Sequence, residues 1–221
     1  VSLYQHGKTK TELIKEYDIV LEQFRPGVMD KLGLGYEELK KVNPGLIYCS
    51  LTGYGQTGPL KSLAGHDINY IARSGMLSHA GKDATGPSLM NFQIADIASG
   101  TMNSVVAILA AVNYRRNTGK GQYIDISMAD GCIPFNSIDG ANFLVSGVAP
   151  RREKERLNGG CIYDFYETKD GEYMSVGSLE PQFWKNFCIA IEREDLIEGT
   201  VWPEDIESVK AEIRGIFKTK S

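Results

Sequence analysis

A histidine and two aspartates have the residue types and positions that proton transfer requires. His66 and Asp67 lie in the segment GHDINY, where a polar, glycine-containing loop changes into a helical pattern. Asp96 follows thirty residues after His66 and directly precedes the strongest helical pattern of the chain. Histidine titrates near neutral pH and can begin a reaction as an acid or as a base. A carboxylate can act as a base or as a nucleophile.

Helix capping is the competing role for these side chains. A polar side chain at the start of a helix accepts hydrogen bonds from backbone N–H groups that lack a partner within the helix. Spacing alone favours capping for His66, Asp67 and Asp96. A carboxylate at a helix start also lies beside N–H groups and the positive end of the helix dipole, which stabilise an anion such as an enolate oxygen. Both roles therefore stay open at this point.

Three other charged residues have a structural and a ligand-binding interpretation. Glu180 precedes Pro181 at the start of a helical pattern, where capping is the simpler role. Arg25 and Lys31 lie at a turn from a strand pattern into a helical one. They are either ordinary surface charges or phosphate contacts at the carboxyl edge of a parallel sheet. The glycine-rich segment 53–59 matches neither a dinucleotide-binding nor a Walker motif, so we expect close backbone approach to another segment or a ligand.

The elements that must position these residues alternate between strands and helices. Short apolar runs predict strands over residues 18–21, 46–51 and 122–127. Helical patterns cover residues 28–32, 36–42, 67–74, 97–117 and 129–144. This order predicts an α/β fold with a parallel sheet and flanking helices.

A charged stretch over residues 150–158 indicates a boundary between two parts of the chain. We expect residues 1–150 to belong to a large α/β domain. Residues 151–221 then form a linker and the start of a smaller α+β domain, with a hairpin whose turn contains Asp170-Gly171.

Composition limits the classes of partner. The 221 residues include 24 Lys+Arg and 28 Asp+Glu, a net charge of −4, and such a chain lacks the concentrated basic surface that nucleic acid and anionic membranes require. The longest apolar run, over residues 105–112, is shorter than the roughly 18 residues of a spanning helix, so no membrane partner is expected. Four scattered cysteines without a CxxC motif predict no metal site, reduced thiols and a cytoplasmic location.

Several motifs in order resemble the family III CoA-transferase (CaiB/BaiF) superfamily, which includes the α-methylacyl-CoA racemases. They extend from about Asp18 to Phe183 and read FRPGVMDKLGLG, NPGLIYCSLTGYGQTGP, AGHDINY, GKGQYIDISMADG and SLEPQFW. The resemblance implies a Rossmann-like CoA-binding domain and an interlocked homodimer. It also corresponds to the middle of a longer family chain, and since the sequence has no initiator Met, we expect a fragment.

The finer motifs resemble the racemase branch, which uses a His in a GHDINY segment and an Asp ahead of a helix. By that resemblance His66 and Asp96 are the catalytic pair. Glu180 would pair with His66 and Asp67 and tune the imidazole. This chain differs from the racemase pattern at residues 97–100 (IASG), where racemases tend to have a run of glycines. The GGGGQ-type loop of many transferases is also missing, and residues 158–160 (NGG) come nearest to it.

The remaining family positions concern coenzyme A. Arg25 matches an arginine that contacts the nucleotide portion of CoA, and Tyr70 is assigned to the same ligand. Lys31 stands where racemases often have arginine, a change that keeps the charge but loses the bidentate fork.

The resemblance implies racemisation of 2-methylacyl-CoA thioesters at the α-carbon through an enolate. No metal or redox cofactor is needed, since coenzyme A is part of the substrate. The alternative is a CoA-transferase that moves CoA between carboxylic acids, with Asp96 forming an acyl anhydride. A third possibility is a CoA-binding remnant without turnover.

Overall fold

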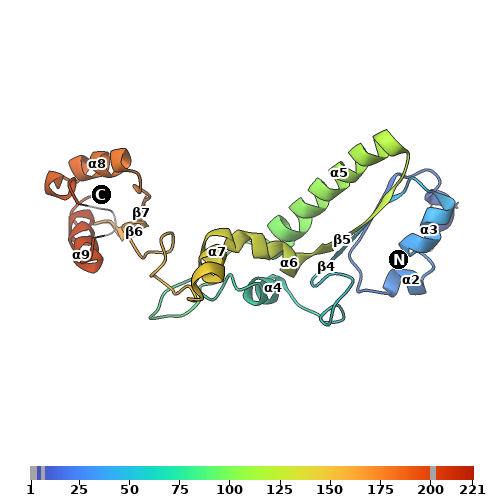
Figure 1. Cartoon of the computed structure of the whole chain (residues 1–221), viewed down its shortest axis with the longest axis horizontal. Helices are drawn as coiled ribbons and strands as arrows, with labels where there is room; N and C mark the ends of the chain where they lie inside the picture. The colour runs from blue at the N-terminus through green and yellow to red at the C-terminus, as the bar shows by residue number, and fades with distance from the viewer. Residues whose placement is uncertain (1–3, 6–7, 200–202) are drawn as a thin grey trace. The chain divides into compact units, whose positions relative to one another are not determined.

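The computed structural model describes residues 4–5, 8–199 and 203–221, and these divide into two compact units (Figure 1). The first unit runs to Met76 and continues over Leu89–Ser137, while the second holds Leu77–Ser88 and Ile138–Ser221. The sequence pattern places the boundary near residue 150 instead. The division falls earlier because residues 138–158 pack against segment 77–88, where Arg152 donates hydrogen bonds to the carbonyl oxygens of Ala80 and Leu77 at 2.8 and 3.1 Å.

A three-stranded parallel sheet organises the first unit and confirms the predicted α/β fold. Its strands are β3 (Ile19–Glu22), β4 (Ile47–Thr52) and β5 (Gln122–Ser127), in the order β3-β4-β5. β4 lies in the centre and is almost wholly buried, as its continuous apolar run requires. The helices of this unit are α1 (Lys10–Leu13), α2 (Val28–Lys31), α3 (Tyr36–Val42), α4 (Asp67–Arg73), α5 (Asn103–Thr118) and α6 (Met128–Cys132). A two-stranded antiparallel ribbon, β1 (Tyr4–Gln5) and β2 (Lys8–Thr9), precedes them.

Side chains of β4 alternate between the two faces of the sheet, as in any strand. The face that carries Tyr48 holds a cluster of three tyrosines, in which the Tyr48 ring lies 6.0 Å from that of Tyr36 and 5.8 Å from that of Tyr123. The Tyr48 hydroxyl donates to the Leu34 carbonyl at 3.1 Å. Thr52 shares this face by its spacing and ends the strand. It therefore lies at the carboxyl edge, where ligands of parallel sheets bind.

The long helix begins earlier than the sequence predicts, and its first part is not α-helical. A nine-residue π-helix, η1 (Ile94–Met102), continues directly into α5, whereas the pattern predicts a helix from residue 97. Wide π-turns are uncommon and frequently occur at functional sites. The prediction that Asp96 precedes the helix is therefore wrong, because the N-cap is Gln93 and Asp96 lies inside the first turn.

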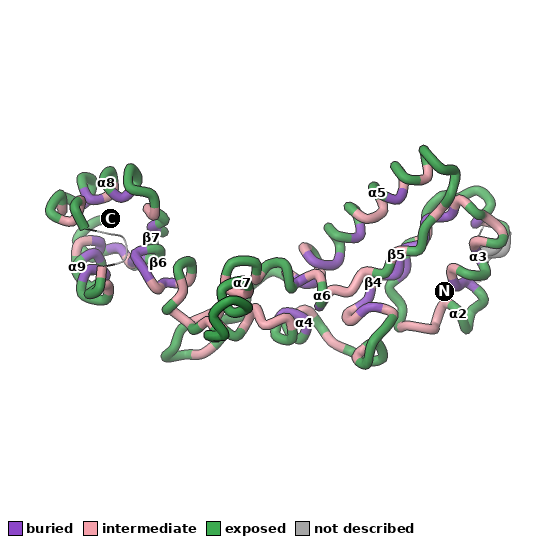
Figure 2. The backbone as a smooth tube through the Cα atoms, in the orientation of Figure 1, coloured by how far each residue is buried: buried purple, intermediate pink, exposed green. Residues whose placement is uncertain are grey.

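Most of α5 is exposed rather than buried (Figure 2), although the helix is rich in apolar residues. Met102, Val105, Val106 and Leu109 are each more than half exposed. Within the described residues, the run Ile94–Thr118 is long and apolar enough to cross a membrane by length and composition, a test that core helices of soluble proteins also pass. A spanning helix was not expected from the sequence, because its longest uninterrupted apolar run is short. That expectation does not hold for Ile94–Thr118, where small residues between the apolar ones keep the average hydropathy high.

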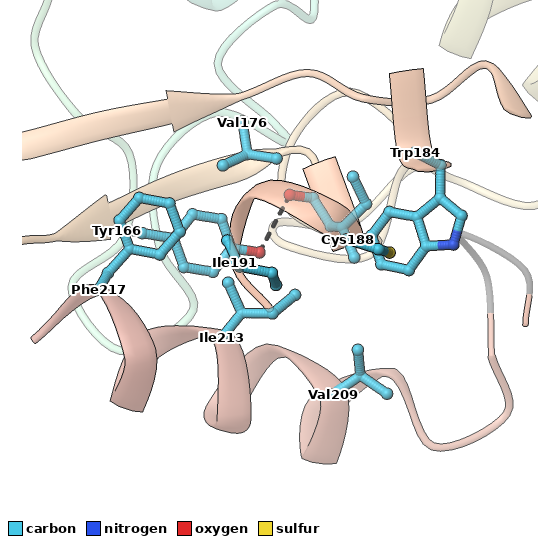
Figure 3. Packing of buried hydrophobic residues seen from close by; sticks show 9 residues of the cluster. Tyr166, Val176, Trp184, Cys188, Ile191, Val209, Ile213 and Phe217 are labelled. Atoms are coloured by element: carbon cyan, nitrogen blue, oxygen red, sulfur yellow. Dashed lines mark hydrogen bonds between the residues drawn. The ribbon is translucent and has the colours of Figure 1, made fainter. Parts of the chain in front are cut away.

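The second unit has its own core and is an α+β unit, as predicted. The first unit ends with η2 (Ile133–Asn136), and α7 (Ser137–Ser146) begins at its last residue and continues into the second unit. The other elements of the second unit are β6 (Asp164–Glu167), β7 (Tyr173–Val176), α8 (Pro181–Ala190), η3 (Glu194–Leu196) and α9 (Ile206–Phe217). β6 and β7 form the predicted antiparallel hairpin. Figure 3 shows the core that the hairpin shares with α8 and α9, where the Tyr166 ring stacks on Phe217 and its hydroxyl donates to the Ile162 carbonyl at 3.0 Å.

Candidate active site

The carboxyl ends of all three parallel strands border one cavity of about 520 Å³. Arg25 follows β3, Thr52 ends β4 and Met128 follows β5. His66 and Tyr70, from the start of α4, line the same cavity. Polar and apolar side chains share the rest of the wall, among them Phe24, Pro26, Lys61, Leu63 and Asn69. The structure thus brings together three of the sequence-predicted residues, Arg25, His66 and Tyr70.

A larger cavity, of about 660 Å³, lies elsewhere in the first unit, and none of the predicted site residues lines it. Asp125 and Asp130 border it, together with Leu60 and residues of the glycine-rich segment 53–59. We take the smaller cavity as the candidate site because it holds the histidine and lies at the carboxyl edge of the sheet.

His66 both caps a helix and borders the cavity. It occupies the N-cap of α4, and its backbone N–H donates to Oδ1 of Asn69 at 2.9 Å. The residue as a whole is exposed. The two roles that the sequence left open are therefore compatible, because the same residue starts the helix and lines the cavity.

Asp67 connects the start of α4 to the start of η1. Its Oδ1 accepts hydrogen bonds from the backbone N–H groups of Ala95 and Asp96, at 2.6 and 3.1 Å. A carboxylate in this position satisfies N–H groups that have no partner inside the π-helix and complements the positive end of its dipole. Asp67 thereby caps a helix that begins 27 residues further along the chain, a function that local sequence could not indicate.

Asp96 is half-buried, and the charges of Asp67 and His66 both affect the pKa of its carboxyl. Burial raises the pKa of its carboxyl above the ordinary value, and the negative charge of Asp67 raises the pKa further. The charge of His66 acts in the opposite direction. His66, Asp67 and Asp96 therefore form one cluster at the junction of α4 and η1, although Asp96 is not among the residues that line the 520 Å³ cavity.

Replacing Asp67 by asparagine is expected to move the acid limb of the pH–kcat/KM profile to lower pH. The amide keeps an oxygen that can accept the two N–H bonds, but it removes the negative charge that raises the pKa of Asp96. If Asp96 acts as a carboxylate, its active form then persists to lower pH. The pH profile of the variant measures this shift.

Asp67→Ala serves as the control for this experiment. It removes the acceptor as well as the charge, so it should also destabilise the protein by about 0.5–2 kcal/mol, as other losses of a helix cap do. An acid limb of Asp67→Asn that stays in place or moves to higher pH would contradict the expectation.

Tyr70 is held between two glycines of the loop that precedes α4. Its hydroxyl donates to the Gly65 carbonyl at 2.6 Å, and its ring packs edge-on against that of Tyr54 at 5.2 Å between centroids. A Cβ atom added at Gly53 would lie 2.5 Å from the Tyr70 ring, and one at Gly65 would lie 2.8 Å from it. The predicted close backbone approach is thus confirmed at Gly53, where the partner is this tyrosine ring.

Gly53→Ala is expected to destabilise the protein by about 1–3 kcal/mol, because the new methyl group must displace the Tyr70 ring. Chemical denaturation measures the change. Gly45→Ala is the matched control in the same unit, since its nearest atom would lie at an ordinary 3.4 Å. The double variant Gly53→Ala/Tyr70→Ala should lose less than the sum of its single changes, and full additivity would show that the two sites do not clash.

The other sequence-predicted residues have separate surroundings. Arg25 also lines a neighbouring cavity of about 210 Å³, which the three clustered tyrosines border. Lys31 ends α2, is exposed and lines neither cavity. Glu180 is the exposed N-cap of α8 in the second unit, so its pairing with His66 and Asp67 of the first unit stays a prediction.

The described residues contain no group of three or more His, Cys, Asp or Glu side chains that could hold a metal ion. The cavity instead offers cations, a histidine, hydroxyl and amide groups and apolar side chains. Such a set fits an organic ligand that carries both negative charge and apolar surface.

Comparison with known proteins agrees with this arrangement. The sequence model of CoA-transferase family III matches residues 5–221. The human protein named alpha-methylacyl-CoA racemase is 38% identical over 211 residues, which are 95% of this chain and 55% of that protein. Human succinyl-CoA:glutarate CoA-transferase is 32% identical over 189 residues, 86% of this chain and 43% of that protein.

A solved structure shows the same fold. The crystal structure of a CaiB/BaiF family protein from Brucella suis superimposes with a TM-score of 0.78 at 30% identity, covering 96% of this chain and 57% of the other. The chain spans about half the length of the curated relatives it matches. With a family match over almost every residue and a shared fold, the chain belongs to CoA-transferase family III.

Proposed function

We propose that the protein containing this chain racemises 2-methylacyl-CoA thioesters at the α-carbon. The observation that carries the proposal is the cluster at the junction of α4 and η1. His66 lines the cavity there, and the adjacent Asp67 accepts a hydrogen bond from the backbone N–H of the half-buried Asp96. The similarity to racemases over 95% of the chain supports the same reaction.

The reaction needs two groups that act on opposite faces of one carbon. The thioester makes the α-proton removable, and one of His66 and Asp96 takes it while the other delivers a proton to the opposite face. The two side chains exchange these roles with the direction of the reaction. A positioned acid or base typically contributes roughly 10²–10⁴-fold to such a step.

Stabilisation of the enolate oxygen requires a correction to the sequence-based expectation. That expectation assigned the oxygen to N–H groups at the start of the helix after Asp96. In the structure the N–H groups of Ala95 and Asp96 are bonded to Asp67, and that of Ile97 donates to the Gln93 carbonyl at 3.0 Å. These three donors are already occupied, so a different donor is needed for the oxygen.

A CoA-transferase is the second candidate, favoured by the similarity to succinyl-CoA:glutarate CoA-transferase. In that reaction Asp96 attacks the thioester carbonyl, forms an acyl anhydride and releases CoA as the thiolate, which an acceptor acid later recovers. His66 would then have a secondary role.

We also propose that the protein containing this chain forms a homodimer, lies in the cytoplasm and takes an acyl-CoA as its small-molecule partner.

Incubation of one enantiomer of a 2-methylacyl-CoA in deuterated water separates the candidates. Racemisation with deuterium uptake at the α-carbon, in the absence of an acceptor acid, supports the racemase. Acceptor-dependent exchange of CoA, together with hydroxylamine trapping of an acyl group on Asp96, supports the transferase. Binding of CoA without either reaction would identify a binding protein and contradict both.

A further inference from the structure

The hydroxyl of Thr52 is a buried polar group that the fold itself does not use. The residue is 7% exposed, and its Oγ1 atom has no hydrogen-bond partner among the described residues. It ends the central strand β4 and lines the 520 Å³ cavity together with His66. Because buried hydroxyls in native proteins are nearly always bonded, an unbonded one at a cavity wall indicates an interaction with a ligand.

Neighbouring hydroxyl groups have partners, which sets Thr52 apart. Ser50, two residues earlier on the same face of β4, accepts a hydrogen bond from the Tyr123 hydroxyl at 3.1 Å. Tyr70, whose ring closely approaches the adjacent Gly53, uses its hydroxyl to bond the Gly65 carbonyl. A glycine at position 53 adds no side chain that could reach Thr52. Of these three hydroxyls, that of Thr52 is therefore the one for which the described residues supply no partner.

We propose that Thr52 donates a hydrogen bond from Oγ1 to a carbonyl oxygen in the thioester arm of an acyl-CoA bound in this cavity. The proposal rests on the function proposed above, which makes an acyl-CoA the ligand. An acyl-CoA arm carries such oxygens in its thioester and in its amide groups. The N–H groups of Ala95 and Asp96 cannot serve them, because Asp67 occupies both.

The test compares Thr52→Val, which keeps the shape of the side chain but removes the hydroxyl, with Thr52→Ser, which keeps the hydroxyl. Both substitutions are made in the whole protein that contains this chain. We expect Thr52→Val to lose about 5–20-fold in acyl-CoA affinity or in kcat, and Thr52→Ser to stay within about threefold of the parent. Calorimetric titration with CoA and with a 2-methylacyl-CoA measures affinity, and α-deuterium uptake measures turnover.

Stability without ligand separates a binding role from a structural one. Since Thr52 has no partner to lose, Thr52→Val should unfold at the same temperature as the parent or a higher one. Ser104→Ala is the matched contrast, because Ser104 is also buried but its hydroxyl donates to the Gly100 carbonyl at 2.8 Å, so its removal should lower the unfolding temperature. A lower unfolding temperature for Thr52→Val would show an internal partner and overturn the proposal.

The kinetic pattern tells which oxygen is bound. A loss in kcat at unchanged affinity indicates the thioester oxygen, on which charge develops in the enolate, whereas an equal loss of affinity for CoA and acyl-CoA indicates an amide of the arm. If Thr52→Val binds and turns over like the parent, the assignment of Thr52 is wrong while the proposed function stands. If the parent binds neither CoA nor acyl-CoA, both fail.

Discussion

Replacing His66 by alanine is expected to lower exchange of the α-proton by about 10²–10⁴-fold, the contribution of one positioned acid or base. His66 lines the cavity, and its charge lowers the pKa of Asp96, so loss of the imidazole removes proton transfer on one face of the carbon. Deuterium uptake from deuterated water into each enantiomer of a 2-methylacyl-CoA, followed by mass spectrometry, measures the effect.

His79→Ala is the matched control for the His66 variant. His79 is a histidine of the second unit whose Nε2 lies 3.3 Å from the Asp139 carboxylate, and it lines none of the cavities described above. We expect its replacement to leave α-proton exchange within about threefold of the parent, well below the effect of one acid or base. Full exchange activity in His66→Ala would remove the racemase proposal.

Replacing Asp96 by asparagine is expected to lower either proposed reaction by at least about 10²-fold. The amide has nearly the same shape, but it neither accepts a proton at neutral pH nor forms an acyl anhydride. The backbone N–H of residue 96 can still donate to Asp67, so the cap of η1 should persist. Steady-state rates of racemisation and of CoA exchange, measured on the same preparation, test both reactions.

The two candidate functions predict different residual chemistry for these variants. In a racemase, Asp96→Asn should still allow proton exchange on the face served by His66, so that one enantiomer exchanges faster than it racemises. In a transferase, the same change eliminates hydroxylamine trapping, while His66→Ala leaves trapping in place. Full activity of Asp96→Asn in both assays would exclude this carboxylate from the chemistry.

Much of the first unit could be predicted because its signals are local. The apolar runs DIVL and LIYCSL and the alternating run QYIDIS predict strands, and each overlaps a strand of the parallel sheet to within one residue at either end. The helices predicted over residues 28–32 and 36–42 agree with α2 and α3 to within one residue. Because the strands are parallel, the residues that follow them lie at the same carboxyl edge of the sheet. For this reason Arg25 and His66 line one cavity.

The start of the long helix was not predictable in the same way. A π-helix depends on hydrogen bonds to the fifth residue and on packing against neighbours, here α4 and α6, rather than on residue preferences. The same holds for its cap, because Asp67 reaches N–H groups 28 and 29 residues away. The helical pattern over residues 97–117 was correct, but it did not indicate that apolar residues such as Val106 and Leu109 are exposed in this chain.

Local sequence patterns were enough to predict most of the strands and helices, their order and the titratable residues near the cavity, because hydrophobic period and turn chemistry are properties of short segments. The arrangement of the site became visible in the folded chain alone: Asp67 caps the start of η1, Asp96 lies within the first turn of η1, and Thr52 lines the cavity with a hydroxyl that has no partner among the described residues. Hydrogen bonding and burial depend on contacts between residues distant in the chain, and those contacts exist only after the strands and helices have packed.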